Sequence, residues 1–517
     1  MWRHSPRQPH RLSQAPTRVR LALVAGAALA CTLCAGPIAT AATAKPSPQR
    51  PPREQLTIAP EEAMKPWTGD LNGMIERKMI RVLTVYSKTF YFVNKGVQRG
   101  ATYDIFRLFE DDLNKRLAKE GKLKSKHLKV RVVFIPVNRG DLLPALVAGK
   151  GDIAASNLTI TAGREQLVDF SSPVYRRVSE LVVSGPASPA VSSVDDLAGQ
   201  EVFVRKSSSY YESLVALNQR LVADNKPVVI IKEAPETLED EDLLEMVNAG
   251  LIPLMIVDQH KADFWKQIFP NITVHDGVAV RTGGEIAWAI REGSPQLKAA
   301  LDHFVARHAQ GTTLGNTILA RYLKNAKYVK DAASEAERQK FLALIQFFQA
   351  YGDQYDVDWL LMAAQGYQES QLNQAVRSPV GAIGVMQVMP ATGKELGVGD
   401  ITQVEPNIHA GVKYMRWMID QYYGKEPMTK LDKALFAFAS YNAGAGRMSQ
   451  LRKEAARRGL DPNVWFHNVE YVAAEKIGAE TVTYIGNIYK YYIAYRLIMD
   501  VRAERKQALE QVKSRSP

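Results

Sequence analysis

The sequence predicts a multidomain protein in which a two-lobed α/β domain is followed by an all-α domain. The length is the first indication, because 517 residues are too many for one ordinary hydrophobic core. Between residues 75 and 327, short β-branched runs alternate with helical patterns, which is typical of a parallel sheet covered by helices. Beyond residue 337 the strand patterns almost vanish and helical patterns remain.

The N-terminal segment, residues 1–44, has the composition of a secretory signal peptide. Five arginines and no acidic residue come first, an apolar stretch covers residues 21–35, and Ala42-Thr43-Ala44 offers a cleavage site. The apolar stretch is shorter than the roughly 20 residues of a membrane-spanning helix. We therefore expect export and a periplasmic mature protein, with an uncleaved N-terminal anchor as the alternative.

Both cysteines, Cys31 and Cys34, lie inside this segment. A lipoprotein signal needs a Leu-small-small pattern before the cysteine, and Leu29 stands one position late for Cys31. Cleavage after Ala44 would leave a protein without cysteine, so the fold is expected to need no disulfide, although the compartment permits one.

The net charge of +12 comes partly from the same segment. Without its five arginines the chain keeps 61 basic and 54 acidic residues, a net charge of +7. This excess suits an anionic polymer such as peptidoglycan, and equally nucleic acid or an anionic membrane surface. Charge alone therefore does not identify the partner, and nucleic-acid binding has no other feature in its favour.

Residues 45–74 are rich in Pro, Lys, Arg and Gln at their start and are expected to form a linker. The α/β domain follows at residues 75–327. Its first lobe is expected to contain strands at 80–86, 130–135 and 152–155, with helices at 103–117 and 141–148. A second set of strands is expected at 201–204, 228–231 and 254–257, and a run at 286–291 would carry the chain back. Two lobes crossed twice by the chain indicate a hinged cleft.

The all-α domain is expected at residues 338–500, after a polar linker at 328–337. Gly, Asn and Pro clusters separate its helices. The tail, residues 501–517, is expected to be a charged helix or a frayed end. Helices are predicted at 341–351, 359–370, 408–423, 430–441, 447–458 and 481–500.

Glu369 is the main candidate for catalysis. It ends an apolar helical stripe that includes Leu360, Ala363 and Tyr367. A carboxyl in such a place can be desolvated, which disfavours its charged form and raises its pKa, so that it can protonate a glycosidic oxygen. Neither a Cys/His cluster nor a zinc-ligand spacing occurs, and we expect no metal and no cofactor.

Three motifs in this region together resemble the catalytic domain of the soluble lytic transglycosylases, which has a goose-lysozyme-like α fold. The family has a Glu-Ser pair, a Gly-Leu-Met-Gln loop and an Ala-Tyr-Asn-Ala-Gly loop in this order. Val385 and Ser440 depart from the pattern without touching a catalytic group. The motifs stand here as Glu369-Ser370, Gly384-Val385-Met386-Gln387 and Ser440-Tyr441-Asn442-Ala443-Gly444, with Glu480-Thr481, Tyr484 and Asn487 resembling the last motif.

The resemblance implies the chemistry. Glu369 would protonate the leaving oxygen of the MurNAc–GlcNAc β-1,4 bond and then accept a proton from the C6 hydroxyl of the same MurNAc. The internal attack gives a 1,6-anhydroMurNAc end without water, so one carboxylate suffices where most glycosidases use two. The substrate, peptidoglycan glycan strands, is expected to contact Ser370, Ser378, Met386, Gln387, Tyr441 and Asn442.

Residues 75–325 resemble the family-3 periplasmic solute-binding proteins, through motifs around Gly149, Thr159, Val168 and Ala289. Arg164 matches the arginine that clamps an amino acid carboxylate in that family, and its guanidinium fork suits such a group. The alternative is that Arg164 pairs with a nearby acid, Asp169 or Glu165, in a vestigial cleft. The residues expected to bind a small amino acid or stem-peptide ligand are Asn157, Thr159, Arg164, Ser209 and Asp258.

This pairing of modules is a known architecture among the lytic transglycosylases, and it implies ligand regulation and peripheral attachment to the outer membrane. Two other functions stay open. The chain could be a solute receptor whose helical domain only docks on the wall, although an intact Glu369 argues against this. It could also be a hydrolytic muramidase, for which Glu480 is the best candidate as the water-activating base.

Overall fold

The computed structural model describes residues 63–515, except residues 95, 124, 126, 187, 325 and 327–334. The expected signal peptide and most of both expected linkers therefore lie outside the described residues. The end of the first linker is folded, because helix α1 (Leu71–Glu76) occupies it and buries Leu71 and Met74. Asp70 caps this helix and accepts a hydrogen bond from the backbone N–H of Leu71.

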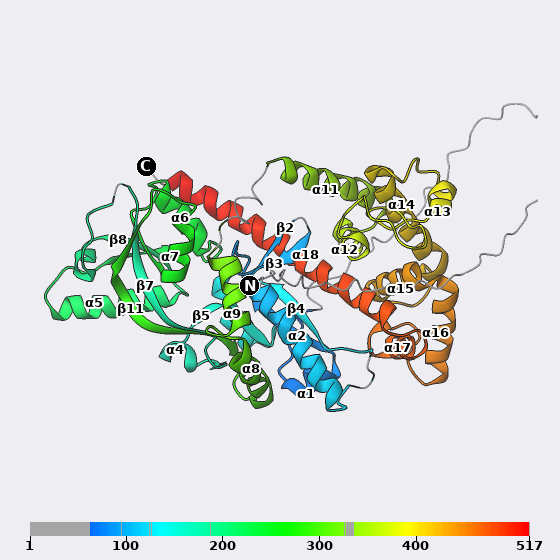
Figure 1. Ribbon diagram of the computed structural model, residues 1–517, viewed down its shortest axis with the longest axis horizontal. Helices are drawn as coiled ribbons and strands as arrows, with labels where there is room; N and C mark the ends of the chain where they lie inside the picture. The colour runs from blue at the N-terminus through cyan, green and yellow to red at the C-terminus, as the bar shows by residue number, and fades with distance from the viewer. Residues whose placement is uncertain are drawn as a thin grey trace, which may run out of the picture.

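The N-terminal half is built on one continuous nine-stranded sheet (Figure 1). In the first lobe, β1 pairs in parallel with β4 and β5, as the β-branched runs predict. Helices cover this part of the sheet, and the core between them is aromatic, with Phe106, Phe134 and Trp288 buried. The elements are β1 (Met79–Thr84), α2 (Ala101–Lys119), β4 (Arg131–Pro136), α3 (Leu142–Val147), β5 (Ile153–Thr159), α8 (Pro295–His308) and α9 (Thr313–Leu323), with the hairpin β2 (Phe92–Asn94) and β3 (Val97–Arg99) and the short α4 (Ala162–Glu165).

The second lobe repeats the arrangement. Strands β8, β9 and β10 are parallel, and α5, α6 and α7 pack on them around a second core. Two long antiparallel strands, β7 and β11, join the lobes, so the prediction of two crossings is confirmed. The predicted strand at 286–291 is only the end of β11. The elements are β6 (Asp169–Phe170), β7 (Tyr175–Ser184), β8 (Glu201–Arg205), α5 (Ser209–Ala223), β9 (Ile230–Ala234), α6 (Asp240–Asn248), β10 (Leu254–Asp258), α7 (Gln259–Trp265) and β11 (Thr273–Ile290).

The C-terminal half is helical, as predicted; a single turn of π-helix follows α14, and a kinked segment, Trp465–Val469, precedes α17. Small and aromatic side chains of α12, α14 and α15 fill its core, which includes Phe436 and Trp465. The fold class, a periplasmic-binding-protein-like domain followed by a helical domain, is confirmed. The helices are α11 (Glu335–Tyr355), α12 (Trp359–Ser370), α13 (Pro390–Leu396), α14 (Val404–Met418), α15 (Lys430–Ala443), α16 (Ala445–Arg457), α17 (Glu470–Lys476) and α18 (Ala479–Arg515).

Helix α18 connects the two halves, and it includes the tail, which takes the first of the two forms expected for it, a charged helix. It continues unbroken through the expected boundary at residue 500 and ends beside α6 of the second lobe (Figure 1). Along the way Lys490 Nζ lies 3.4 Å from Glu110 Oε2 of the first lobe. Near its end, Arg505 Nη2 lies 2.5 Å from Asp242 Oδ1, and Ala508 is buried against the core of the second lobe. The charged tail is therefore a structural strap and not a frayed end.

No helix in the described part of the chain combines the length and the apolar character needed to span a bilayer.

Candidate active site and ligand cleft

Helix α12 presents Glu369 in its last turn. Asp358 caps the start of the helix by accepting a hydrogen bond of 2.9 Å from Leu360 N. Gln371 ends it in a left-handed conformation, with φ at 55°. The helix is also held at both ends by α18, because Tyr492 donates to Asp358 (2.7 Å) and Tyr484 donates to Glu369 (2.5 Å). The position of Glu369 is therefore set by the strap helix as well as by α12.

Burial raises the pKa of Glu369 to about 7, although the hydrogen bond from Tyr484 works in the opposite direction. Tyr484 is itself buried and accepts a hydrogen bond of 3.1 Å from Gln365 Nε2, one turn before Glu369. Among the described residues, Tyr484 is the one side chain hydrogen-bonded to Glu369. A carboxyl with this pKa is protonated and deprotonated in comparable amounts near neutral pH, as an acid that later serves as a base requires.

A tightly tied loop follows Glu369. The Ser370 hydroxyl donates to Val385 O (2.9 Å). The Tyr441 hydroxyl, near the end of α15, donates to Met386 O (2.7 Å). Asn407 fixes the loop from α14 by accepting from Met386 N (2.8 Å) and donating to Ile383 O (2.7 Å). The Ser370 hydroxyl and the Met386 side chain are buried, and both help to hold the loop in place.

The other residues expected to contact substrate lie around the same loop. Ser378 Oγ accepts a hydrogen bond of 2.8 Å from Ala382 N, and Gln387 donates to Gly384 O at the same distance. Asn442 accepts a hydrogen bond from Thr481 at the start of α18 (2.7 Å). Burial raises the pKa of Tyr441, and the Glu369 carboxylate raises it further.

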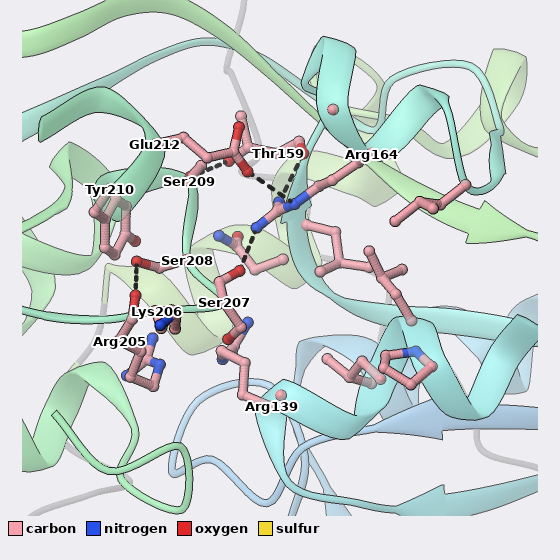
Figure 2. A pocket seen from close by; sticks show the side chains of 18 of the residues that line it. Arg139, Thr159, Arg164, Arg205, Lys206, Ser207, Ser208, Ser209, Tyr210 and Glu212 are labelled. Atoms are coloured by element: carbon pink, nitrogen blue, oxygen red, sulfur yellow. Dashed lines mark hydrogen bonds and ion pairs between the residues drawn. The ribbon is translucent and has the colours of Figure 1, made fainter. Parts of the chain in front are cut away.

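The cleft between the two lobes of the N-terminal half brings together all five residues predicted to bind a ligand. The Arg164 guanidinium donates to Thr159 O and to Ser207 O, both at 2.8 Å, and so joins the lobes (Figure 2). Ser209 begins α5 and donates to the Thr159 hydroxyl (3.3 Å). Asn157 and Asp258 also meet across the cleft: Asn157 Nδ2 donates to Asp258 Oδ2 over 2.7 Å.

The charges that a ligand would meet already have partners within the protein. The carboxylate nearest Arg164 is Glu212 of the second lobe, at 3.6 Å, and not Asp169 or Glu165. The Lys261 ammonium lies 3.1 Å from Asp258. The lobes are also joined by Arg139 and Glu239, at 2.6 Å. The structure therefore shows a cleft whose lobes are joined by Arg164 and Arg139, with Glu212 beside Arg164 and Lys261 beside Asp258.

A cavity of about 300 Å³ remains beside these groups. Five cationic side chains and the carboxylate of Glu212 lie along its wall, several of them shown in Figure 2. Each of these cations lies within 4 Å of a carboxylate of the protein. The cationic residues are Arg139, Arg164, Arg205, Lys206 and Lys261.

Comparison with known proteins covers both halves of the chain. The family described as "Transglycosylase SLT domain" matches residues 346–463, and "Bacterial extracellular solute-binding proteins, family 3" matches residues 81–325. A membrane-bound lytic murein transglycosylase F of Pseudomonas fluorescens is 28% identical over 85% of this chain and 89% of its own length. One from Desulfosudis oleivorans is 27% identical over 80% of this chain and 89% of its own. The chain therefore carries a solute-binding-like domain followed by a transglycosylase SLT domain, and it is similar to these murein transglycosylases over most of its length.

A solved substrate-binding protein of an amino acid ABC transporter from Streptococcus pneumoniae, bound to L-arginine, is 18% identical to this lytic transglycosylase. The match covers 51% of this chain and 100% of the other, with a TM-score of 0.39. The chain is thus an enzyme, a peptidoglycan lytic transglycosylase, with a solute-binding-like domain at its N-terminal side.

Sequence reasoning missed several residues that position the groups of the transglycosylase. Gln365 and Asn407 hold Tyr484 and the loop after Glu369, and both could have been found as polar residues on otherwise apolar helix faces. Glu212 and Lys261 carried no sequence signal, because a charged residue on a helix normally faces solvent. Within the described residues, no three His, Cys, Asp or Glu side chains gather as they would around a metal ion.

Proposed function

We propose that this enzyme cleaves the β-1,4 bond between MurNAc and GlcNAc and forms a 1,6-anhydroMurNAc end. Glu369 as a carboxylic acid gives its proton to the glycosidic oxygen, and the bond from that oxygen to C1 of MurNAc breaks. The carboxylate then takes the proton of the C6 hydroxyl while O6 bonds to C1. Glu369 regains its proton at the end of the cycle, and no water is consumed.

The observation that carries this proposal is a carboxyl with a pKa of about 7, held by a tyrosine. Tyr484 binds Oε1, which leaves Oε2 for proton transfer. Acid and base steps by one residue need a pKa near the working pH, because each step uses a different protonation state. The substrate contacts proposed for the surrounding loops are Ser378, Gln387, Tyr441 and Asn442, with Ser370 and Met386 acting through the loop they hold.

The test is mass spectrometry of the products from purified sacculi, with the wild type and Glu369→Gln. Anhydromuropeptides from the wild type alone support the proposal. Products that carry an added water would make the enzyme a muramidase. Glu480 is the candidate base in that case, since it lies one turn before Tyr484 on the same face of α18. No product from either protein would favour a binding protein.

We also propose that a small amino acid or a stem peptide binds in the N-terminal cleft and regulates the catalytic domain. Its carboxylate would replace Glu212 at Arg164, and its ammonium would replace Lys261 at Asp258. The support is the continuity of α18, which touches Glu369 through Tyr484 at one end and the second lobe through Arg505 at the other. A ligand acts through such a link only if its affinity differs between two states.

Calorimetric titration of the purified protein with amino acids and stem peptides, followed by turnover of sacculi at each ligand concentration, tests this regulation. Binding that disappears in Arg164→Ala and changes turnover supports it. A ligand that binds without changing turnover would refute the regulatory part.

We infer a periplasmic location with peripheral attachment to the outer membrane from the composition of residues 1–44 and from the similarity to membrane-bound lytic murein transglycosylases. Fractionation of cells that express the full chain tests this. Protein that stays with outer-membrane vesicles at low salt and leaves them at high salt supports peripheral attachment, whereas protein found only in the soluble periplasmic fraction would refute it.

A further inference from the structure

Exposed aromatic rings are rare in this protein and meet at one place. In the described part of the chain, the two exposed aromatic side chains are Trp417, with 46% of its surface accessible, and Tyr422, with 42%. Their ring centroids lie 5.8 Å apart, with the planes at 89°. Large aromatic rings bury most of their surface in a typical fold, so a pair left open to solvent calls for a binding partner.

Two further aromatic rings connect this exposed pair to the loop beside Glu369. Trp417 stacks on Tyr414 at 5.6 Å with planes 10° apart, and Tyr414 meets Tyr441 edge-on at 5.5 Å. Tyr441 donates to Met386 O in the loop after Glu369 and lies within electrostatic range of that carboxyl. A row of four rings therefore runs from the loop after Glu369 to the outer surface at the end of α14.

The backbone after α14 has a conformation that positions the Tyr422 ring next to Trp417. Trp417 and Tyr422 are five residues apart, which in a regular α-helix would separate them by about 140° around the axis. A single turn of π-helix, Ile419–Tyr423, follows α14 at this point. Its wider turn brings residues five apart close together, and such turns are frequent at functional sites. The turn therefore gathers Trp417 and Tyr422 into one surface.

We propose that Tyr414, Trp417 and Tyr422 form an aromatic platform that binds a sugar ring of the glycan strand beyond the bond that is cut. The apolar face of a pyranose ring stacks on aromatic rings, while its hydroxyl and acetamido groups stay in water. The occupant is the substrate itself, because the row of rings is continuous with the active site. This inference rests on the proposed transglycosylase function and adds a binding site to it.

The platform makes a prediction about glycan length. A strand that reaches it gains affinity that a short fragment lacks, because binding energy far from the reacting bond is available only to the longer substrate. The wild type then prefers long strands, measured as the ratio of kcat/KM for a MurNAc–GlcNAc octasaccharide to that for a tetrasaccharide. An aromatic contact of this kind corresponds to a ratio change on the order of tenfold.

The experiment measures this ratio for the wild type, Trp417→Ala, Trp417→Leu and Trp417→Phe. Loss of the preference by about tenfold in the Ala and Leu variants, with Phe keeping most of it, supports the platform. A Leu variant that equals the wild type would overturn it, since apolar area alone would then suffice. Met499→Ala is the control, because Met499 is an equally exposed side chain on α18, at 44%.

A second measurement separates the two proposals. In the Glu369→Gln background, tryptophan fluorescence is followed as the octasaccharide is added, with and without Trp417→Phe. A change that depends on Trp417 supports the platform even if the reaction turns out to be hydrolysis. Anhydro products without any Trp417 effect would leave the proposed function standing and refute the platform.

Discussion

The catalytic site and the ligand cleft both hold charged groups away from solvent, but they satisfy them to different degrees. Glu369 has one hydrogen-bonding side chain, and its pKa rises to about 7. Arg164 in the cleft has two carbonyl acceptors and a carboxylate within 3.6 Å. In the proposed function Glu369 exchanges a proton, and its single hydrogen-bonding side chain leaves one carboxylate oxygen available for this step. Arg164 instead joins the two lobes, and its contacts with Ser207 and Glu212 are called the latch below.

The largest effect is expected for Glu369→Gln, which removes the reactive group. We expect kcat to fall by about 10³-fold or more, because general acid–base catalysis by a positioned residue contributes roughly 10²–10⁴-fold. Release of anhydromuropeptides from sacculi measures this. A variant with more than a tenth of wild-type activity would show that another group carries the reaction.

The same substitution should stabilise the protein at alkaline pH. Folding raises the pKa of Glu369 from 4.5 to about 7, so the folded state holds the proton more tightly than the unfolded state. Stability is therefore lost as the pH rises from about 4.5 to 7, and the loss persists above that range. Relative to wild type, Glu369→Gln should gain about 1–3 kcal/mol at pH 8 and less at pH 5. Chemical unfolding at both pH values checks the sign.

A substitution that breaks the contact between α18 and the second lobe should strongly lower the stability of the protein. Arg505 is buried and lies 2.5 Å from Asp242 and 3.6 Å from Glu241, so Arg505→Ala leaves two buried carboxylates without this cation. Removing one partner of a buried ion pair costs about 3–5 kcal/mol. We expect the midpoint of thermal unfolding to fall by on the order of 5 °C or more.

The neighbouring Lys506→Ala is the control for the strap, because Lys506 is exposed and its ion pair is with Glu510 on the same helix, at 3.9 Å. We expect this variant to unfold at the wild-type temperature. If both variants unfold together, the Arg505 network does not hold α18 against the second lobe.

Tyr484→Phe tests how far the single hydrogen bond from Tyr484 sets the pKa of Glu369. It removes the hydrogen bond that lowers the pKa of Glu369, so that pKa should rise. Because the first step needs protonated Glu369, the alkaline limb of the kcat profile should move to higher pH, while kcat falls about tenfold through lost positioning. Tyr355→Phe, at a tyrosine that bonds to His409, is the control. A downward shift of the limb would refute the assigned role.

The parts of this architecture that sequence predicts are the local ones. Glu369, Gln387 and Tyr441 stand in short motifs, and each motif lies within one helix end or loop. Residues 239–242 are four consecutive acids, which from sequence favour a solvated surface, yet all four are buried. Their burial depends on Arg139, Arg205, Lys261 and Arg505, which come from four distant elements.

The docking of the tail on the second lobe could not be predicted, for the same physical reason. The sequence at 501–517 is charged and carries no sustained apolar pattern, so its helix could be predicted but its docking could not. The docking includes Arg505 beside a buried acidic cluster and Ala508 against the core of the second lobe, and both contacts join parts of the chain that are distant in sequence. Hydrophobic periodicity reports which face of an element is buried, but it does not report which distant charges will be neutralised there.

The smallest effect is expected at the latch. Glu212 is 37% exposed and 3.6 Å from Arg164, a geometry in which an ion pair contributes only about 0.2–1 kcal/mol. Glu212→Gln removes the internal competitor for a ligand's carboxylate, so affinity for the amino acid or stem peptide that binds the wild type should rise about two- to fivefold by calorimetry. Glu201→Gln is the control, because Glu201 is exposed on the second lobe and pairs with Lys232, and neither residue lines the cavity. Weaker binding in Glu212→Gln would mean that Glu212 is itself part of the ligand site, and the cleft would then recognise a cation beside Arg164 instead of a carboxylate.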